Sequence, residues 1–419
     1  SNGTPDKQEA IVPERKVKGK KERKDQSHTP PRSSRNLRAI GLFLIGCIIL
    51  LSIFTVALSI QNDINYSTAS GRLIDKNWVE TMEWLPTHTP DPGVNYFGEY
   101  QKANFVYPNT SYGILSWWDY GHYITFIGKR IPVTSPFQDN LMGPSGAAAF
   151  LLADSEQNGS MILDAFNARY VITDTSLGSD KLAAVAIWHD SETSWYPYMK
   201  SFFQKNPAYG DQFLRSNREL PPYYQLMMTR LHNFDGSMQV PGNITYLEYY
   251  NQNVRGLSYP IITNVRYLNV SSAEAAIRSF KPGYTGATDA VLVGDYLHPI
   301  EKVPALRHFR LVYESPGNSQ GLINNDNSGV VSVNFVKVFE YVKGAHIAGD
   351  GVIELKVETN TGREFTYKQD SINGEFIVPY STVNNPYDVK AVGNYHILGT
   401  NRAIDVSEED VLQGRTVGG

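Results

Sequence analysis

The clearest pattern along the chain is an uninterrupted apolar stretch near its beginning. Residues 39–60 contain no charged side chain and are rich in Ile, Leu, Phe and Val. A helix over this stretch would be roughly 33 Å long, which is enough to cross the hydrocarbon part of a bilayer. A signal peptide has a shorter apolar part and a nearby cleavage site. The pattern therefore predicts one transmembrane helix over residues 39–60.

Charged residues flank this stretch unequally. Residues 1–38 carry 11 Lys and Arg and 5 Asp and Glu, a net charge of +6, whereas the remainder carries −10. Cationic flanks favour the cytoplasmic side of a membrane, so residues 1–38 are predicted in the cytoplasm and residues 62–419 outside the cell membrane. A basic tail rich in Pro, Ser, Lys and Gly is expected to be disordered and drawn to anionic headgroups, rather than to nucleic acid.

After the apolar stretch, helical and strand patterns alternate. Trp78, Val79, Met82 and Leu85 recur at helical spacing, which predicts a helix that Pro86 ends. The pattern predicts helices over 75–85, 145–152, 160–166, 181–188 and 271–280, and strands over 113–118, 170–173, 310–313 and 331–341. Such alternation predicts a mixed α/β (α+β) core domain with some parallel strand pairing. We assign residues 62–343 to this domain.

A region rich in Tyr, Pro and Phe interrupts the predicted core domain. It covers residues 189–253 and includes the segment Pro221-Pro-Tyr-Tyr-Gln225. We interpret it as an insertion made of helices with long connections.

The last part of the chain, residues 344–419, has a different pattern. Ile353, Leu355 and Val357 alternate with polar residues, as in a half-buried strand, and Asn373-Gly374 is a turn sequence. Several short strands at close spacing predict a separate small all-β domain, either a barrel or a sandwich. The segment 405–410 is expected to be a capped edge near its end.

The most informative polar pattern is Trp117-Trp-Asp-Tyr-Gly121, at the end of the strand predicted over 113–118. Indole N–H groups are hydrogen-bond donors and a carboxylate is an acceptor. Two indoles beside Asp119 can therefore donate to the oxygen of a hydroxyl group while the carboxylate accepts its proton. The alternative is a buried strand end at which the indoles only pack and Asp119 starts a turn.

This motif and several other segments resemble the catalytic subunit of the oligosaccharyltransferases, which attach glycans to asparagine in Asn-x-Ser/Thr, and archaeal members in particular. The resemblance includes residues 78–86, 128–138, 168–174 and 336–344, and it runs from about Ala39 to the end of the chain. At 419 residues the chain is too short for the whole subunit. It is identified as the last transmembrane helix and outward-facing C-terminal region of such a transferase.

The resemblance implies roles for individual motif residues. Trp117, Trp118 and Asp119 would bind the Ser/Thr hydroxyl of the acceptor sequence, and Tyr120 and Gly121 would shape the turn. A rigid hydroxyl pocket rejects a ligand without the hydroxyl by roughly 10⁴-fold or more, because the polar groups of the pocket would remain unpaired.

Members of the family carry a second short motif, Asp-x-x-Lys-x-x-x-Met/Ile, on a helix beside this pocket. The nearest match lies in residues 178–187, with Gly178 in the acidic position, Lys181 in the lysine position and Val185 in the apolar position. Asp180 is adjacent but out of register. Lys181 and Val185 are candidates for the same pocket. The alternative is a helix packed on the core with Lys181 in solvent.

The resemblance also implies a divalent cation, Mn²⁺ or Mg²⁺, and a lipid-linked oligosaccharide on dolichol phosphate or pyrophosphate. The family binds the cation through Asp-x-Asp motifs and a glutamate in loops between earlier transmembrane helices, and this chain contains no Asp-x-Asp. Its nine histidines show no ligand spacing, and Cys47 is expected to be a small apolar residue in the membrane. Metal ligands and catalytic residues are therefore expected outside this chain.

The expected partners are the acceptor polypeptide, the lipid-linked oligosaccharide, the membrane and the enzyme's own N-terminal transmembrane region, with no nucleic acid. One alternative is a non-enzymatic, single-pass, membrane-anchored ectodomain that binds carbohydrate or peptide through its 26 tyrosines. A protease or hydrolase is a weaker alternative, because it would need a nucleophile–base pair and none is visible in the sequence.

The chain contains six Asn-x-Ser/Thr sequences of its own. They begin at Asn2, Asn65, Asn109, Asn158, Asn243 and Asn269. The first is predicted on the cytoplasmic side and the other five on the outer side. Modification of the chain itself is an option, although chance explains most such sequences in a chain rich in Asn and Ser.

Overall fold

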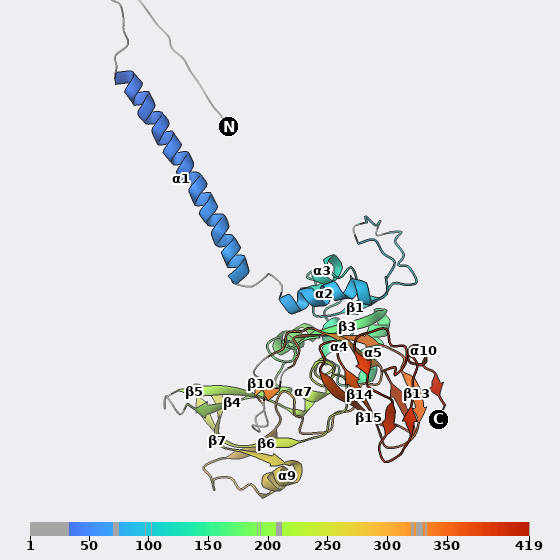
Figure 1. Ribbon diagram of the computed structural model, residues 1–419. Coiled ribbons are helices and arrows are strands. Elements are labelled where there is room, and N and C mark those ends of the chain that lie inside the picture. Colours follow the sequence, from blue (N-terminus) through green and yellow to red (C-terminus); the bar gives the residue numbers. More distant parts are fainter. Residues whose placement is uncertain are drawn as a thin grey trace, which may run out of the picture. The chain divides into compact units, whose positions relative to one another are not determined.

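The computed structural model describes residues 33–69 and 75–418, except residues 97, 102, 191, 193, 207–211, 320–321, 324–329 and 332 (Figure 1). The predicted disordered tail up to residue 32 lies outside the described residues. The chain divides into two compact units, Ser1–Leu73 and Ile74–Gly419.

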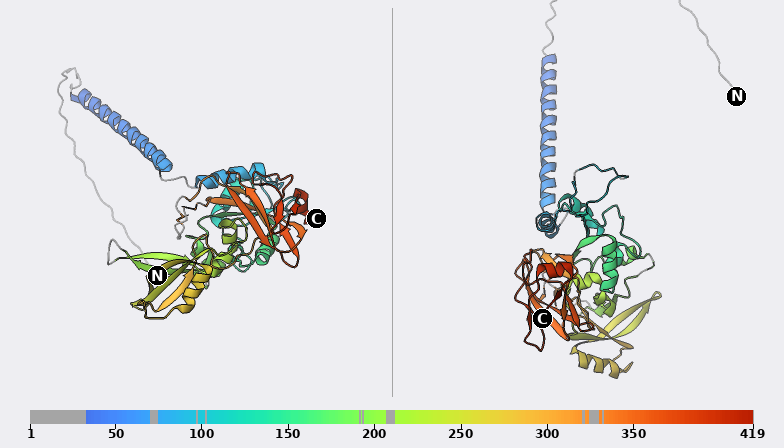
Figure 2. Two further views of the ribbon diagram at one scale, coloured as in Figure 1. Left: turned by 60° about the horizontal axis from the view of Figure 1, so that its bottom comes forward. Right: turned by 90° about the vertical axis from the view of Figure 1, so that its right-hand side faces the viewer.

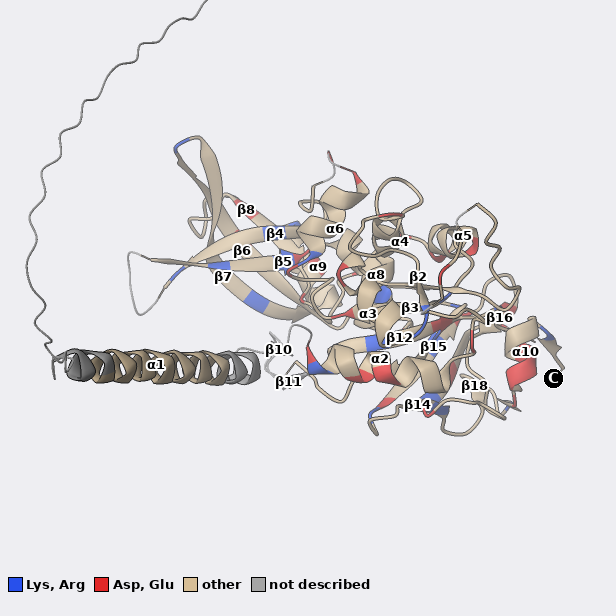
Figure 3. Cartoon of the chain, turned by 90° about the horizontal axis from the view of Figure 1, so that it is seen from above, with Lys and Arg blue, Asp and Glu red and all other residues tan. Residues whose placement is uncertain are grey.

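The first unit contains the helix α1, Ser33–Ala69. Its part Ala39–Asn62, with a mean hydropathy of 2.8, is long and apolar enough to cross a membrane. Apolar side chains are exposed all along this part, and Cys47 is exposed among them. Figure 3 shows no charged residue along the middle of α1. A helix that is apolar on every side suits contact with lipid, so the structure contains the predicted membrane-spanning candidate.

The second unit is built on a mixed five-stranded sheet in the order β2-β1-β3-β12-β9. The bounds are β1 Gly113–Leu115, β2 Ile131–Pro132, β3 Ala168–Asp174, β9 Phe309–Glu314 and β12 Val336–Tyr341. β1 is parallel to β2 and β3, whereas β12 is antiparallel to β3 and β9. The predicted mixed core with some parallel pairing is confirmed.

Helices cover both faces of this sheet. Successive side chains of a strand point to opposite faces, so neighbouring residues of β3 contact different helices. Ile172 in β3 joins an apolar cluster with α2 (Lys76–His88) and α3 (Gly121–Phe126). Its neighbour Val171 joins the main cluster on the other face, with α4 (Ala147–Leu152), α5 (Glu156–Ala165) and α6 (Leu182–His189). The sheet is therefore the middle layer of three.

The predicted elements of this core are present with shifted ends. Pro86 does not end α2, which continues to His88, because the one backbone hydrogen bond that proline removes lies in the last turn. α5 begins earlier than predicted because the Ser155 side chain accepts a hydrogen bond from the Asn158 N–H and caps the helix. The strand predicted over 113–118 ends at Leu115, since a 3₁₀ helix follows.

A second five-stranded sheet, in the order β5-β4-β7-β6-β8, replaces the predicted helical insertion. The bounds are β4 Met199–Lys205, β5 Phe213–Glu219, β6 Asn243–Val254, β7 Leu257–Asn269 and β8 Asp289–Val293. The helix α9, Val270–Ser279, lies against it (Figure 1). Among the described residues of 189–253, α7 (Pro221–Gln225) and α8 (Met227–His232) are the helices that follow the end of α6 at His189. The prediction of helices for that region is wrong.

The β6–β7 hairpin explains this error. Arg255 and Gly256 link the strands, and both have positive φ, as the two central residues of a type I′ turn do. An Arg-Gly pair is a weaker turn signal than Asn-Gly, so the sequence did not separate the two strands.

The last part of the chain contains two further sheets, in the orders β16-β13-β20 and β15-β14-β18-β19, with β17 also paired with β14. The strands are β13 Ala345–Ala348, β14 Val352–Glu358, β15 Glu364–Asp370, β16 Glu375–Val378, β17 Lys390–Ala391, β18 Tyr395–Ile397, β19 Ala403–Ile404 and β20 Thr416–Val417. Figure 2 shows these orange and red strands together near the C-terminus. The predicted short strands are present, whereas a barrel is not confirmed.

Two segments near the predicted strands differ from the expectation. The segment 405–410 leads into the helix α10, Glu408–Gln413, because Ser407 and Asp410 form a reciprocal capping box. The strand predicted over 331–341 begins at Val336, and the short pair β10 (Leu322–Ile323) and β11 (Val330–Val331) precedes it.

Candidate functional site

The candidate site lies at one edge of the central sheet. β1 leads into the Trp-Trp-Asp motif, and β3, which is parallel to β1, ends at Asp174. The carboxyl ends of adjacent parallel strands meet at the same edge, and ligands of open α/β sheets bind there. The topology therefore brings the motif and the segment after β3 together.

A tight backbone turn presents the motif. Trp117 precedes a 3₁₀ helix, Trp118–Tyr120, and Gly121 begins α3 directly afterwards. A methyl group on Gly121 would overlap the carbonyl oxygen of Thr134 and the Cα of Ser135. Only glycine fits this close approach, and the role of Gly121 in shaping the turn stays a prediction.

The two tryptophans have different surroundings. Trp117 is 3% exposed and belongs to the main apolar cluster. Trp118 is half-buried, and its ring centroid lies 6.3 Å from that of Trp117 and 6.4 Å from that of Trp188 in α6. The Trp118 Nε1 atom is buried and has no hydrogen-bond partner within the described part of the chain. A buried N–H group without a partner is a ready donor for a ligand.

Asp119 and Lys181 form an ion pair at the site. The Lys181 Nζ is 2.8 Å from the Asp119 Oδ2, and the two side chains are 23% and 35% exposed. Lys181 is the residue that precedes α6. The structure thus brings together Asp119 of the first motif and Lys181 of the second motif. Lys181 does not extend freely into solvent.

Tyr120 contacts Lys181 of this ion pair and packs on α2. Its ring stacks on Trp78 of α2 at a centroid distance of 3.4 Å, and its hydroxyl accepts a hydrogen bond from the Lys181 Nζ at 3.1 Å. Burial raises the pKa of Tyr120 strongly, and the negative charge of Asp174 raises it further. Tyr120 therefore stays protonated and neutral, and it shapes the site through contacts as well as through the turn.

Asp174 is a site residue that sequence reasoning missed. It is buried at the end of β3, and its Oδ1 accepts hydrogen bonds from the backbone N–H groups of Ser176 and Leu177 at 3.0 and 3.1 Å. Its Oδ2 lies 4.0 Å from the Lys181 Nζ. An acidic residue at the carboxyl end of a buried strand, beside the strand that carries the motif, was the signal available in the sequence.

The residues of the second short motif do not all lie at the candidate site. Val185 is fully buried in the main apolar cluster. Gly178, in the acidic position of the motif, leaves no room for a side chain because a Cβ would lie 2.7 Å from the Tyr223 hydroxyl. Trp188, one helical turn beyond Val185, is the α6 residue that contacts Trp118, and sequence reasoning did not select it.

The described residues contain no group of three or more His, Cys, Asp or Glu side chains suited to hold a metal ion. The polar atoms at the site are instead an indole N–H, a carboxylate, an ammonium and a neutral phenol. A small group that both donates and accepts hydrogen bonds, such as an alcohol, complements this set.

Two family models match the chain. The AglB core domain model matches residues 75–178, and the archaeal glycosylation protein B long peripheral domain model matches residues 341–417. The first match contains the Trp-Trp-Asp motif, and the second covers nearly the same residues as the predicted β domain. The division at 343/344 stays a prediction.

Curated relatives match most of the chain. The dolichyl-phosphooligosaccharide-protein glycotransferase 3 of Archaeoglobus fulgidus is 28% identical over 82% of this chain and 42% of its own length. The dolichyl-monophosphooligosaccharide–protein glycotransferase AglB of Haloferax volcanii is 30% identical over 77% of this chain and 36% of its own length. The chain thus spans less than half the length of both relatives.

Solved structures share the fold. An Archaeoglobus fulgidus oligosaccharyltransferase in complex with Zn and sulfate superimposes with a TM-score of 0.57 and 22% identity, over 82% of this chain and 46% of its own. The same enzyme tethered to an acceptor peptide with the sequence NVT has a TM-score of 0.58 at 21% identity, over 82% and 43% of the two chains. A complex of AglB from that organism with an inhibitory peptide and a dolichol-phosphate has a TM-score of 0.56 at 21% identity, over 82% and 42%.

Proposed function

Because the chain belongs to the archaeal oligosaccharyltransferase family, we propose that it is the acceptor-binding part of an enzyme that transfers a glycan from a lipid-linked donor to the asparagine of Asn-x-Ser/Thr. Its relatives are named as glycotransferases that use dolichyl-linked oligosaccharides. These names favour an enzyme over a non-catalytic binding ectodomain. The related structures with an acceptor peptide and with a dolichol-phosphate support these two classes of partner.

The observation that carries the proposal is the buried Trp118 Nε1, which has no partner among the described residues, beside the Asp119 carboxylate. In the proposed complex, the Ser/Thr hydroxyl of the acceptor accepts a hydrogen bond from Trp118 and donates its proton to Asp119. A carboxylate has several lone-pair positions, so Asp119 can accept this proton while its Oδ2 remains on Lys181. Trp117 contributes by packing behind Trp118.

Lys181 has two roles in this proposal. It fixes the Asp119 carboxylate at 2.8 Å, and its hydrogen bond to the Tyr120 hydroxyl at 3.1 Å ties that carboxylate to the motif turn. Trp188 and Trp118 supply the apolar surface for the rest of the acceptor side chain. Val185 supports α6 from the core instead of contacting the acceptor.

The proposed chemistry of this part is positioning. The reacting asparagine lies two residues before the hydroxyl residue, and an amide nitrogen is a weak nucleophile. A pocket that fixes the hydroxyl orients the amide toward the glycan donor and thereby removes much of the entropic cost of the encounter. We assign the divalent cation and the donor to other parts of the longer protein, since the donor set at this site suits an alcohol and does not suit a metal. The Zn²⁺ of the related structure shows metal binding for that enzyme.

The proposed location follows from α1. The basic flank supports a cytoplasmic location for the start of the chain, and in this proposal the second unit is exported and faces the acceptor polypeptides. Multi-pass topology of the longer protein is part of the same proposal.

The test is a transfer assay with the full-length enzyme and an Asn-x-Thr peptide. Asp119→Ala removes the acceptor for the hydroxyl, so we expect transfer to fall by about 100-fold or more, the effect of losing a charge-assisted hydrogen bond together with orientation. Asp180→Ala is the matched control, because Asp180 is exposed and lies one residue from Lys181. Near-normal transfer by Asp119→Ala would contradict the proposed site.

A further inference from the structure

One of the chain's own Asn-x-Ser/Thr sequences lines a polar cavity. We propose that Asn109 is an N-glycosylation site of this protein and that the first sugar residue of its glycan occupies this cavity. The cavity has a volume of about 530 Å³, and Asn109, Thr110 and Ser111 form part of its wall. The proposal shares with the proposed function only the outward location of the second unit.

The other sequences in the second unit are poor acceptors in the folded chain. Asn158 and Ser160 lie inside the helix α5, where the backbone cannot extend into an enzyme. Asn243 begins β6, and Thr245, whose hydroxyl a transferase would need, is buried in that paired strand.

In the sequence that begins at Asn269, the Asn269 and Ser271 side chains are engaged in local hydrogen bonds. The Asn269 Oδ1 accepts from the Ser272 N–H at 2.9 Å and from the Ser271 hydroxyl at 3.0 Å, which caps α9. Both side chains that a transferase must reach are therefore engaged with each other. The sequence at Asn65 lies within the helix α1.

Asn109 differs from all of these because it lies in a loop between α2 and β1. Asn109 and Thr110 are exposed, and Ser111 is half-buried. Thr110 and Ser111 themselves are held by a hydrogen bond from the Ser111 N–H to the Pro108 carbonyl at 2.9 Å, one from the Asn167 side chain to the Ser111 carbonyl at 2.7 Å, and the weak Thr110 hydroxyl contact with the Pro92 carbonyl at 3.4 Å. Such a loop can open toward an enzyme without loss of a helix or a strand.

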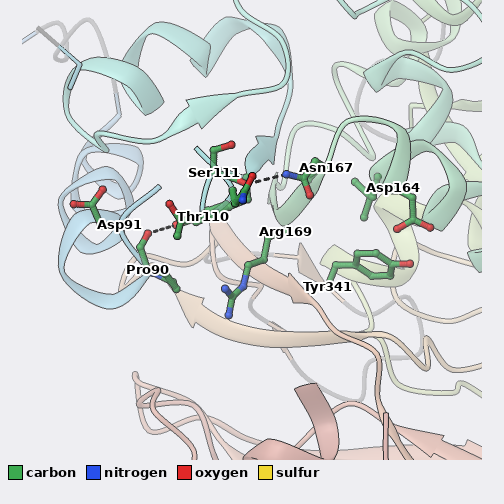
Figure 4. Close-up of a pocket in the computed structure, with 12 residues that line it drawn as sticks. Pro90, Asp91, Thr110, Ser111, Asp164, Asn167, Arg169 and Tyr341 are labelled. Atoms are coloured by element: carbon green, nitrogen blue, oxygen red, sulfur yellow. Dashed lines mark hydrogen bonds between the residues drawn. The ribbon is translucent and has the colours of Figure 1, made fainter. Parts of the chain in front are cut away.

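The cavity walls suit a sugar ring. Figure 4 shows Asp91 and Thr110 on one side and Asp164 and Tyr341 on the other, with Arg169 between them. A sugar hydroxyl both donates and accepts hydrogen bonds, so neighbouring carboxylates and a guanidinium complement it. The C–H groups of the ring can pack on the Tyr341 ring.

The Arg169 side chain is held ready for such a ligand. Its Nε donates to the Glu340 Oε1 at 2.8 Å, and the guanidinium lies over the rings of Tyr112 and Tyr170 at 5.8 and 5.6 Å. A donor that is already fixed loses little conformational entropy when a ligand binds.

A glycan at this position would leave the candidate site open. Arg169 is near the start of β3 and Asp174 is at its end, and a rise of about 3.3 Å per residue separates them by roughly 17 Å. The cavity and the Trp-Trp-Asp motif are therefore at opposite edges of the central sheet.

The modification is an ordinary glycosyl transfer from a lipid-linked glycan phosphate. A bond forms between the Asn109 Nδ2 and the anomeric carbon, the bond from that carbon to the phosphate oxygen breaks, and the phosphate keeps the electron pair. The amide loses one proton, which the released phosphate takes up. A transferase of the host can perform this reaction, so the modification does not require the activity of this chain.

The test is to express the full chain in an archaeal host that makes lipid-linked glycans and to map glycopeptides by mass spectrometry. We expect a glycan on the peptide that contains Asn109, its loss in Asn109→Gln, and its retention in Asn158→Gln. An Asn109 peptide without glycan would overturn the proposal, whether or not another sequence is modified. Cleavage by a protease added outside intact cells separately tests the outward location that the proposed function also needs.

The cavity itself is tested by enzymatic removal of the glycan. Asp164 is exposed, so Asp164→Ala should fold normally and leave Asn109 modified. We expect the glycan to be released about fivefold faster in this variant, the effect of one lost hydrogen bond, and at the unchanged rate in Asp180→Ala. Equal rates in the two variants would place the sugar outside the cavity.

Discussion

Lys181 connects the parts of the candidate site. Its Nζ contacts Asp119 at 2.8 Å, the Tyr120 hydroxyl at 3.1 Å and Asp174 at 4.0 Å. One ammonium group thus joins the motif turn to the end of β3. The orientation of Asp119 depends on a residue more than sixty positions away along the chain.

Lys181→Met tests this connection. The variant keeps most of the side-chain length but loses the charge, so Asp119 would lose its ion-pair partner and be less well oriented. We expect affinity for an Asn-x-Thr peptide to fall about 10-fold, the lower end of the effect of a hydrogen bond to a charged group, because the pair is partly exposed. Isothermal titration would measure it. The control is Lys390→Met, which removes an exposed ion pair with Asp388, and an equal loss in both variants would contradict the assignment.

Chemical type and spacing predicted part of this site. Two indoles beside a carboxylate indicated hydroxyl binding, and the approximate second motif indicated Lys181. Asp174 and Trp188 were not predicted, because their proximity to the motif depends on parallel pairing of β1 with β3 and on the packing of α6. An acidic residue after a buried strand was the signal available for Asp174, but the sequence does not show which strand pairs with β3 or where α6 packs.

Glu219 provides a pH-dependent test at the residue scale. Burial at the end of β5 raises the pKa of Glu219 to about 7. The native state therefore keeps this proton up to about pH 7, whereas an unfolded glutamate loses it near pH 4.3. Stability is lost as the pH rises through this window, because the native state binds more protons than the unfolded state.

Glu219→Gln removes this loss. We expect the variant to be more stable than the parent by about 3–4 kcal/mol at pH 8 and nearly equal at pH 4, as the size of the pKa shift requires. Thermal unfolding of the detergent-solubilised chain at the two pH values would measure the difference. The same gain at both pH values would show that the proton is not responsible.

At the scale of elements, the turn from η1 (Trp118–Tyr120) into α3 is tightly constrained. Gly121→Ala would force a methyl group against the backbone of Thr134 and Ser135, and overpacking costs about 1–3 kcal/mol. We expect a lower melting temperature together with loss of peptide binding. Gly242→Ala is the matched control, since no atom lies within 4 Å of its added Cβ. If Gly121→Ala has the same melting temperature and peptide binding as Gly242→Ala, the close approach at Gly121 is contradicted.

Elements with strong local signals were predicted well. The caps and apolar spacing of α2 and α9 are visible in the sequence, and the alternation in β14 identified a strand. The β4–β8 sheet was missed because aromatic residues and prolines in 189–253 fit neither period clearly, and because both pairing partners of β6, the strands β7 and β8, lie beyond this region. Pairing that depends on a distant partner cannot be inferred from one segment alone.

At the scale of the whole second unit, charged side chains join the last sheets to the central one. Arg363, before β15, binds Asp235 at 2.7 Å and Glu314 of β9 at 2.6 Å. Arg310 of β9 binds Glu408 of α10 at 2.6 Å. The main apolar cluster also continues from the central sheet into this region. These contacts indicate that the last region stabilises the domain that carries the site.

Arg363→Ala tests that coupling. It would leave the buried carboxylates of Asp235 and Glu314 without this partner, and breaking a buried ion pair costs about 3–5 kcal/mol. We expect a large loss of stability in denaturant unfolding. Lys356→Ala, which removes a half-exposed ion pair with Glu364, should cost less than about 1 kcal/mol. Similar effects of the two substitutions would mean that the last region is only loosely attached.

The most direct test of the proposed acceptor site is the binding of two peptides that differ only in a hydroxyl. An Asn-x-Thr peptide and an Asn-x-Val peptide have nearly the same shape, so the difference in their affinities for the chain measures the hydroxyl pocket. We expect binding of the Thr peptide only, and its loss in Asp119→Ala but not in Asp180→Ala. Equal binding of both peptides, or binding that persists in Asp119→Ala, would contradict the assignment of Trp118 and Asp119 as the hydroxyl site.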